Sequence, residues 1–476
     1  MMDSRFTNLL IIVPTRNRAD LAINAICSVL EQDGSHVQVL VSDNSTQVEE
    51  SRKLAEFCRG LPGDRLSYIQ PPEPLPMSRH WNWAIEQALQ RSTASHFVYL
   101  TDRMIFRPGE LHRLVEILEA FPDRVVSYNH DRIVDHVRPI RVQQFPWTGQ
   151  LFEIASQELL SLASRSVIYH PALPKMLNCA VPRAVLITVR ERFGNIFDSV
   201  SPDFNFCFRC LDVVDGVILY DRSALIHYAL DRSNGMGFVR GIPTPDHKDF
   251  LTTLGTTTSL HFSTPIPEVQ TVGNAIFHEY CTVKQETGSS RFPEVEIESY
   301  IEYLAREVDQ LENVELQERM WVLLSQHGWR KPVLGPRLSR VASRVVELRS
   351  PRKVARKLLW LSTSSMLGNV WLLLARRFGI PLPAHNHIGF KSREAALEIA
   401  IRFPPQKSPQ PNHLPGRFRI LQPPPPVHSS AITADEQLVR DGSTASFVIQ
   451  HLGSNGVMRC SVLAEVPIRK GSDGGV

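Results

Sequence analysis

Residues 9–18 read Leu-Leu-Ile-Ile-Val-Pro-Thr-Arg-Asn-Arg, and this stretch decides the fold class. The apolar run from Leu9 to Val13 is typical of a short strand that is buried on both faces. Pro14 ends the run, and polar residues follow it directly. Residues 17–32 then have a helical pattern, so the chain begins with a strand–turn–helix unit of the kind that builds α/β sheets.

The same alternation of strands and helices continues to residue 128. Strands are expected at 37–42, 66–69, 96–100 and 125–128, and helices at 47–59, 78–91 and 108–121. This pattern predicts an α/β fold with a mostly parallel, Rossmann-like sheet and helices on both faces. Ligands of such sheets bind outside the carboxyl ends of the strands. The residues after the strands, at 14–18, 43–46 and 101–103, are therefore the first candidates for a functional site.

The rest of the chain is less regular. It is expected to contain a helix at 156–163, strands at 185–189 and 217–220, and helical periodicity over 294–326. No elements are assigned within 241–295. The resulting division is a sheet domain at 1–240, an irregular then helical extension at 241–330, a basic helical region at 331–403, and a Pro-rich linker with a loosely ordered tail at 404–476.

Residues 331–357 contain nine Lys or Arg and one acid, Glu347. An apolar stretch with Trp360 and Trp371 follows. One interpretation is an amphipathic helix that lies on an anionic membrane surface. The other is a basic helical subdomain that packs on the rest of the protein, and the sequence leaves both open.

Composition excludes several classes of protein. The 476 residues are 43% hydrophobic, and 52 basic against 49 acidic residues give a net charge of +3, which does not suggest a nucleic-acid binder. Seven Cys are too few for a disulfide scaffold and favour a reducing, cytoplasmic compartment. The run at 9–13 is too short for a signal peptide, and polar residues interrupt the apolar stretch at 358–375. We expect a cytoplasmic protein, with peripheral contact to the inner face of the membrane if the basic region binds lipid.

Six segments in order carry a resemblance to a known family. They lie at 11–18, 41–46, 78–84, 99–109, 201–209 and 216–227. Together they resemble the family 2 glycosyltransferases, which have the GT-A fold, over about residues 7–235. The resemblance implies an inverting transfer of a sugar from a nucleotide-diphosphate donor, a UDP-sugar first, to a hydroxyl of a glycan, a lipid-linked glycan or a protein. The residues alone indicate only a nucleotide-binding α/β domain.

The resemblance also implies which residues bind the nucleotide sugar. They are Pro14, Thr15, Arg16, Arg18, Asp43, Asn82, Asp102 and Arg103. A carboxylate such as Asp43 can accept hydrogen bonds from a base N–H or a ribose hydroxyl. The alternative for Asp43 is a turn-forming Asp, and the alternative for Arg16 and Arg18 is a helix-capping role.

The acidic metal-binding motif of the family is reduced here to Thr101-Asp102-Arg103. In one interpretation Asp102 and His227 still hold Mg²⁺ or Mn²⁺ weakly beside the diphosphate. In the other, the Arg103 guanidinium stabilises the diphosphate directly. We favour the second for the unliganded protein, and a cation arriving with the donor stays an alternative.

Inversion at the anomeric carbon needs a general base that deprotonates the acceptor hydroxyl. The family has a carboxylate at the position of Asp203. Pro202 and Asn205 replace the other acids of this motif, so Asp203 is the predicted base. A helix-capping Asp203 is the alternative, and Asp198 and Asp212 are the other acids nearby.

Two further features have structural alternatives. Cys207 and Cys210 form a Cys-x-x-Cys, but no second pair lies at zinc spacing, so we expect structural cysteines. Residues 233–237 form either a lid over the donor or an ordinary turn. Because the acidic motif is degraded, the alternative function is a catalytically weakened protein that binds a nucleotide sugar or assists assembly in a glycan pathway.

Overall fold

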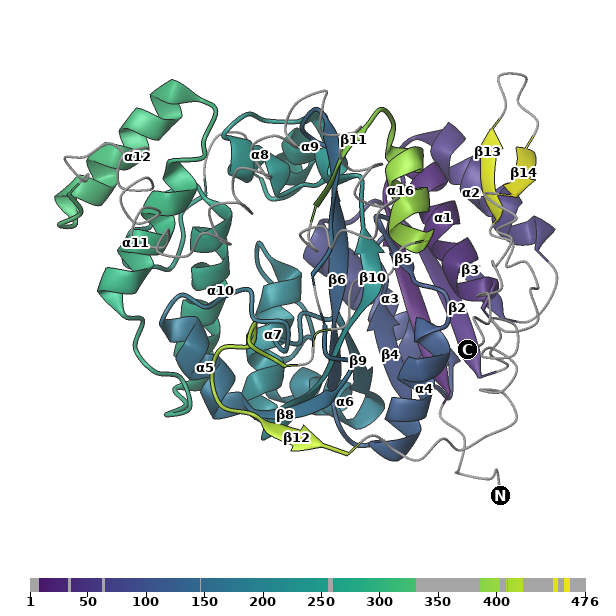
Figure 1. Cartoon of the computed structure of the whole chain (residues 1–476), viewed down its shortest axis with the longest axis horizontal. Coiled ribbons are helices and arrows are strands. Elements are labelled where there is room, and N and C mark those ends of the chain that lie inside the picture. The colour runs from purple at the N-terminus through teal and green to yellow at the C-terminus, as the bar shows by residue number, and fades with distance from the viewer. Residues whose placement is uncertain are drawn as a thin grey trace, which may run out of the picture.

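The fold is described from a computed structural model over residues 8–32, 36–61, 65–145, 147–255, 260–330, 386–402, 408, 410–422, 448–452 and 458–462. Its central feature is a mixed sheet with helices on both faces (Figure 1). The strand order is β12-β8-β10-β6-β9-β4-β1-β2-β3.

Four parallel strands form the first half of this sheet. They are β1 (Leu9–Thr15), β2 (Val37–Asp43), β3 (Leu66–Ile69) and β4 (His96–Tyr99). All seven residues of β1 are buried, as the apolar run predicts. The predicted parallel α/β sheet is therefore confirmed in this part of the chain.

The second half of the sheet mixes both pairings. Antiparallel β9 (Cys179–Pro182) joins β4 to β6 (Val126–Val134), which runs parallel to β10 (Gly216–His227). The remaining strands pair antiparallel: β5 (Met104–Phe106), β7 (Ile140–Gln143), β8 (Leu151–Ala155), β11 (Asn386–Phe390) and β12 (Arg419–Leu421). A separate hairpin pairs β13 (Val448–Leu452) with β14 (Met458–Val462).

Alternate residues of β1 face two different hydrophobic cores, because successive side chains of a strand point to opposite faces. Ile11 and Val13 belong to the core under α1 (Ala19–Leu30), α2 (Val48–Gly60) and α4 (Glu110–Ala120). Leu10 and Ile12 belong to the core on the other face. The helices there are α3 (Met77–Arg91), α5 (Ser156–Ser164), α6 (Arg183–Phe193), α7 (Pro202–Val213), α10 (Val272–Thr287), α11 (Ile297–Val308) and α12 (Val314–Gln326).

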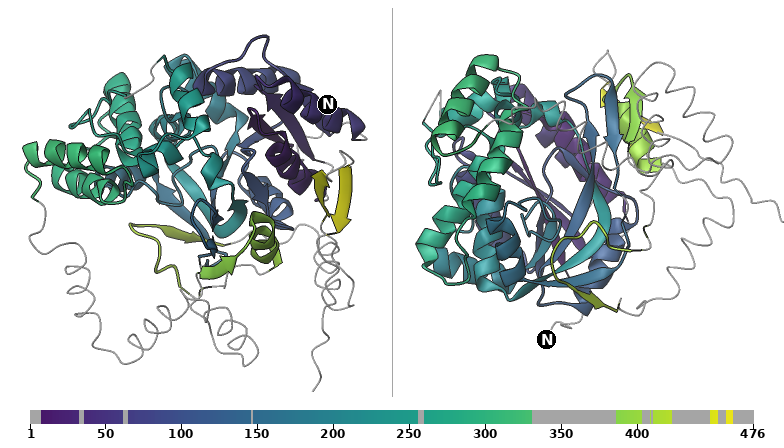
Figure 2. Two further views of the ribbon diagram at one scale, coloured as in Figure 1. Left: turned by 90° about the horizontal axis from the view of Figure 1, so that it is seen from above. Right: turned by 60° about the vertical axis from the view of Figure 1, so that its left-hand side comes forward.

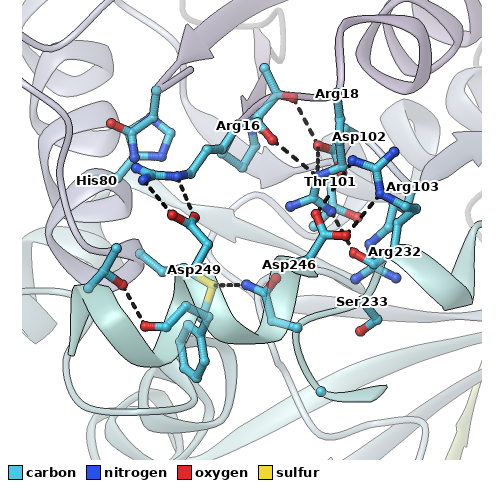
Figure 3. A pocket seen from close by; sticks show the side chains of 18 of the residues that line it. Arg16, Arg18, His80, Thr101, Asp102, Arg103, Arg232, Ser233, Asp246 and Asp249 are labelled. Carbon is cyan, nitrogen blue, oxygen red and sulfur yellow. Dashed lines mark hydrogen bonds and ion pairs between the residues drawn. The ribbon is translucent and has the colours of Figure 1, made fainter. Parts of the chain in front are cut away.

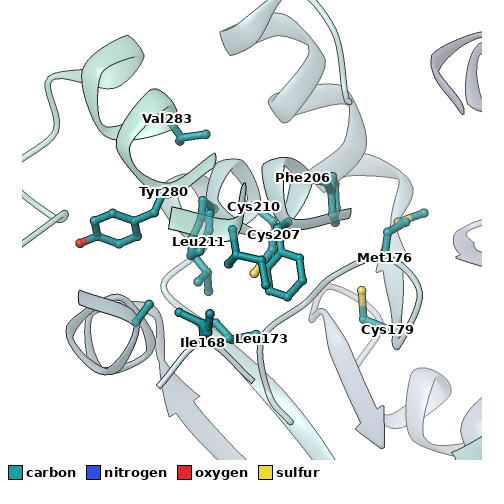
Figure 4. Packing of buried hydrophobic residues seen from close by; sticks show 14 of the residues in the cluster. Ile168, Leu173, Met176, Cys179, Phe206, Cys207, Cys210, Leu211, Tyr280 and Val283 are labelled. Carbon is teal, nitrogen blue, oxygen red and sulfur yellow. The ribbon is translucent and has the colours of Figure 1, made fainter. Parts of the chain in front are cut away.

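Cys207 and Cys210 lie in this second core, and both are fully buried (Figure 4). They pack among Leu173, Phe206 and Tyr280. Burial raises the pKa of both thiols well above the usual value, so they stay protonated. The structural interpretation of the Cys-x-x-Cys is confirmed.

Several predicted elements differ in the structure. The strand predicted at 185–189 is wrong, because this segment lies in α6 and buries only Leu186 and Val189, three residues apart. Helix α3 begins at Met77, one residue before the expected start, and α4 begins at Glu110, after the left-handed cap Gly109. The helical stretch at 294–326 is divided into α11 and α12. The structure has three helices between residues 236 and 287 that were not predicted from the sequence. They are α8 (Met236–Arg240), α9 (Pro245–Thr253) and α10.

Part of the C-terminal third returns to the sheet domain. Helix α16 (Arg393–Arg402) is tied to it by Arg393, which lies 2.6 Å from Asp135 and 2.5 Å from Asp231. Strand β12 extends the sheet beside β8, so this piece of the Pro-rich segment is not a free linker. Figures 1 and 2 show α11 and α12 at one end of the molecule, away from α16.

The basic segment at 331–357 and the apolar stretch after it lie outside the described residues, and both of their interpretations stay predictions. Among the helices that are described, none is long and apolar enough to cross a membrane.

Candidate active site

A cavity of about 710 Å³ lies at the carboxyl ends of β1, β2 and β4 (Figure 3). Its floor comes from the residues after these strands, and its walls come from the starts of α3 and α7. The roof is formed by the 3₁₀ turn η1 (Leu230–Arg232), by residues 233–238 and by α9. The predicted position of a ligand site therefore coincides with a cavity.

Most of the predicted site residues line this cavity. They are Pro14, Thr15, Arg16, Arg18, Asp102, Arg103 and Asp203. Predicted residues from two strand ends and from α7 thus meet in one place. Asp43, Asn82 and His227 do not line it, and each has a definite structural role instead.

Asp43 lies behind the cavity wall and is 1% exposed. Its Oδ1 accepts the Ser45 backbone N–H at 2.9 Å, and its Oδ2 accepts the Tyr68 hydroxyl at 2.8 Å. These bonds turn the carboxylate toward β3 and form an Asx turn. The structure therefore supports the turn-forming alternative, and it places the neighbouring Asn44 at the cavity in its stead.

Asn82 also acts away from the cavity. Its Oδ1 accepts the backbone N–H groups of Ile196 and Phe197 at 3.0 Å each, and its Nδ2 donates to the Phe197 carbonyl at 2.5 Å. This links α3 to the loop that leads into α7. Asn82 therefore positions the segment that carries Asp203 and lies outside the cavity lining.

His227 faces Arg103 instead of the cavity. Burial and the Arg103 charge hold the pKa of His227 well below its usual value, so the imidazole is neutral. Its Nε2 accepts a hydrogen bond from Arg103 Nη1 at 2.9 Å. The His227 ring nitrogen is thus committed to the guanidinium in this structure, and metal binding by His227 with Asp102 stays a prediction.

The degraded acidic motif offers a divalent cation one carboxylate, Asp102, which already has partners. Asp102 Oδ2 accepts the Thr15 hydroxyl at 2.9 Å and lies 3.3 Å from Arg18 Nε. The next side chain is the cation Arg103. Mg²⁺ and Mn²⁺ need several oxygen ligands, and no group of three or more His, Cys, Asp or Glu side chains is placed to hold a metal within the described ranges.

The cavity instead offers unused hydrogen-bond donors. Within the described part of the chain, three buried side-chain atoms of its lining have no partner: Arg16 Nη1, Thr101 Oγ1 and Arg103 Nε. Burial and the nearby Arg18 charge lower the pKa of Arg103 to about 10, so it stays a cation at neutral pH. Because buried donors are costly when unpaired, these three atoms favour an anionic ligand.

Asp203 lies in the first turn of α7 and lines the same cavity as the arginines. Burial raises the pKa of its carboxyl, and the charges of Lys175 and Arg103 oppose this rise. A carboxyl with a raised pKa is better matched to proton abstraction near neutral pH than an exposed one. The structure therefore places the predicted base at the cavity.

Glu279 of α10 holds the start of α7 in place, and sequence reasoning missed it. Its Oε1 accepts the N–H groups of Val200 and Ser201 at 3.1 and 2.7 Å, and its Oε2 accepts Asn205 Nδ2 at 3.1 Å. Asn205, which stands where the family has an acid, thus belongs to this support. No local pattern connects residues 74 positions apart, so only the fold reveals the contact.

The roof carries two acids that pair with arginines, Asp249 with Arg16 of the floor and Asp246 with Arg232 of the roof itself. Asp249 of α9 accepts two hydrogen bonds from Arg16, at 2.8 and 3.1 Å, and Asp246 pairs with Arg232 at 2.9 Å (Figure 3). His247 anchors α9 by bonding the Asn234 carbonyl at 2.8 Å. The segment at 233–237 thus forms part of a roof that is closed over the cavity by ion pairs.

Comparison with known proteins gives the class to which this site belongs. Residues 10–175 match the model described as glycosyl transferase family 2. The match covers the strands and helices that line the cavity floor, and it confirms the resemblance seen in the sequence over residues 10–175.

Among solved structures, the chain is similar to TarS of S. aureus. The crystal structure of TarS matches at 13% identity with a TM-score of 0.36, covering 67% of this chain and 53% of that one. TarS 1–349 in complex with UDP-GlcNAc matches at 13% identity and a TM-score of 0.38, covering 67% of this chain and 91% of that one. The chain thus spans about half the length of the TarS chain in the first of these structures.

Proposed function

We propose that this glycosyltransferase inverts the anomeric centre of a nucleotide-diphosphate sugar, with a UDP-sugar as the first candidate donor, and attaches the sugar to an acceptor hydroxyl. The observation that carries the proposal is one cavity whose lining contains both a carboxylate, Asp203, and the three arginines Arg16, Arg18 and Arg103. This combination suits a reaction that needs a general base and groups that stabilise the charge on the leaving group.

In the proposed reaction, Asp203 takes the proton of the acceptor hydroxyl while that oxygen forms a bond to the anomeric carbon. The bond between this carbon and the diphosphate oxygen breaks, and the nucleoside diphosphate leaves with the electron pair. Arg103, Arg16 and Arg18 meet the charge that develops on the leaving group. The unused Arg103 Nε and Arg16 Nη1 are the donors available for it.

A catalytically weakened donor-binding protein is the second candidate. The motif Thr101-Asp102-Arg103, which lacks the usual metal-ligand acids, favours it. The two candidates differ in turnover: the enzyme releases nucleoside diphosphate from its donor in the presence of an acceptor, whereas the binding protein does not.

A thermal-shift panel tests whether the protein binds a nucleotide sugar, which both candidate functions require. The purified chain is heated with UDP-, GDP-, dTDP- and CMP-sugars, each with and without Mn²⁺. A ligand at 100 times its Kd stabilises the folded state by about 2.7 kcal/mol. We expect a UDP-sugar to raise the melting temperature without Mn²⁺, and a panel with no shift for any nucleotide sugar contradicts the proposal.

Asp249 occupies Nε and Nη2 of Arg16, so it competes with a diphosphate for two of the three guanidinium nitrogens. We therefore predict that Asp249→Asn tightens UDP binding. The pair lies in a partly exposed place, where such pairs are worth about 0.2–1 kcal/mol, so the expected gain is up to about fivefold in Kd.

Isothermal titration of UDP measures this change, with Glu298→Gln as the control. Glu298 is an exposed acid of α11 outside the cavity. Weaker UDP binding in Asp249→Asn would mean that α9 helps to hold the donor and does not compete with it.

A further inference from the structure

A second cavity, of about 380 Å³, adjoins the donor cavity. The two share Phe238 and Val272 in their linings. The ring of Tyr169, which lines the second cavity, lies 6.1 Å from the ring of Phe204, which lines the first and follows Asp203 directly. The candidate base therefore lies near the wall between the two cavities.

Arg132 of β6 lines the second cavity, and nothing in the described structure balances its charge. Its side chain forms no hydrogen bond or ion pair with any other described residue, although burial lowers its pKa. In the parallel register of β6 and β10 it stands beside His227, whose imidazole is neutral. Because Arg132 is partly exposed and lines the cavity, its guanidinium is open to a ligand there.

The other polar groups of the second cavity do not compete for Arg132. Burial raises the pKa of Tyr169 and of Tyr303, so both phenols are neutral. Glu307 is turned to the start of α10, where it accepts the Gly273 N–H at 2.8 Å, and burial raises its pKa. Arg306 lies with its guanidinium 5.5 Å from the ring centre of Tyr303 and adds a second cation.

We propose that the second cavity is the acceptor subsite and that it takes an anionic group of the acceptor, a phosphate or a carboxylate, on Arg132. This inference rests on the proposed function, because only a transferase needs an acceptor beside Asp203. A guanidinium binds either oxyanion through two parallel hydrogen bonds. The Tyr169 and Tyr303 hydroxyls supply further hydrogen bonds to a sugar or polyol next to the anion.

The test uses small probes on the full chain, titrated with and without saturating UDP. Glucose 6-phosphate and glucuronate present the two anions on a sugar of one size, and glucose is the neutral control. We expect at least one of the anionic probes to bind when UDP fills the donor cavity, and glucose to bind more weakly. The arms with phosphate and with carboxylate identify which oxyanion the cavity prefers.

Arg132→Gln is expected to weaken the anionic probe by about tenfold to a hundredfold, the range for the loss of one charged hydrogen-bonding partner. Arg132→Lys keeps the positive charge but loses the planar guanidinium that can form two parallel hydrogen bonds. Its affinity for the anionic probe is expected to lie between those of Arg132→Gln and the wild type. The control is Arg141→Gln, an exposed arginine of the neighbouring strand β7 that lines neither cavity. Its probe affinity is expected to equal that of the wild type.

Equal probe affinity in the wild type and Arg132→Gln overturns the inference, and so does the absence of binding by both anionic probes. These outcomes differ from a failure of the proposed function, which is a failure of UDP or a UDP-sugar to bind at all. In that event the titration without UDP still decides whether Arg132 binds an oxyanion. The melting temperature of Arg132→Gln is measured as well, and a value at or above the wild type shows that lost binding is not lost folding.

Discussion

Asp203→Asn is expected to slow sugar transfer by about a hundredfold to ten-thousandfold, the usual contribution of a general base, while UDP-sugar binding is retained. The substitution keeps the size of the side chain and removes its ability to take a proton. Asp203 lies in the first turn of α7, and Asn82 and Glu279 hold the segment that leads into this turn through Phe197 and Ser201. Transfer is measured as release of UDP in the presence of acceptor, and binding is measured by thermal shift.

The pH dependence gives a second measure of the same residue. Burial raises the pKa of Asp203 above its ordinary value, so the protonated, inactive form persists to higher pH than for an exposed Asp. In the wild type, kcat/KM is expected to rise with pH through this shifted pKa as the base loses its proton. The acidic limb should be absent from the residual activity of Asp203→Asn.

Asp198→Asn is the matched control, because Asp198 lies five residues away, is about half exposed, and does not line the cavity. Its transfer rate is expected to equal that of the wild type. Rapid transfer by Asp203→Asn would show that another group takes the acceptor proton.

The sheet around the site could be predicted because its signals are local. The run Leu9–Val13 is apolar on both faces, and Pro14 marks where it ends, so five neighbouring residues specify a buried strand and its carboxyl end. The position of the cavity then follows from the rule for parallel sheets. The failed strand at 185–189 shows the limit: Val and Ile favour strands, but burial of Leu186 and Val189 alone makes the segment a surface helix.

The orientation of individual side chains could not be predicted in the same way. Asp43 follows β2 as expected, yet Tyr68 of the neighbouring strand β3 turns its carboxylate out of the cavity. His227 has the position of a metal ligand in the sequence but is committed to Arg103, which is 124 residues away in the chain. Asp249 reaches Arg16 only because α9 folds back over the strand ends. Such contacts depend on the whole fold and leave no periodic trace in the sequence.

Arg103→Gln is expected to reduce kcat by about a hundredfold to a thousandfold, the usual loss when one group that stabilises developing charge is removed. Arg103 lines the cavity next to Asp102, His227 fixes its Nη1, and its Nε is unused among the described residues. At a pKa of about 10 the guanidinium is charged at neutral pH, so it can replace the positive charge that a metal ion supplies in related sites. UDP should also bind more weakly, because the diphosphate loses a cation.

Chelation separates the two interpretations of this site. If Arg103 replaces the metal, EDTA leaves wild-type transfer unchanged and Mn²⁺ does not rescue Arg103→Gln. Arg103→Lys keeps the charge but loses the planar guanidinium. Its transfer rate should lie between those of Arg103→Gln and the wild type. Arg59→Gln serves as the control for the loss of one positive charge, since Arg59 is an exposed residue of α2 outside the cavity. Full inhibition by EDTA that Mn²⁺ reverses would contradict this prediction. It would mean that a cation near Asp102 stabilises the leaving diphosphate, with Arg103 beside the metal site.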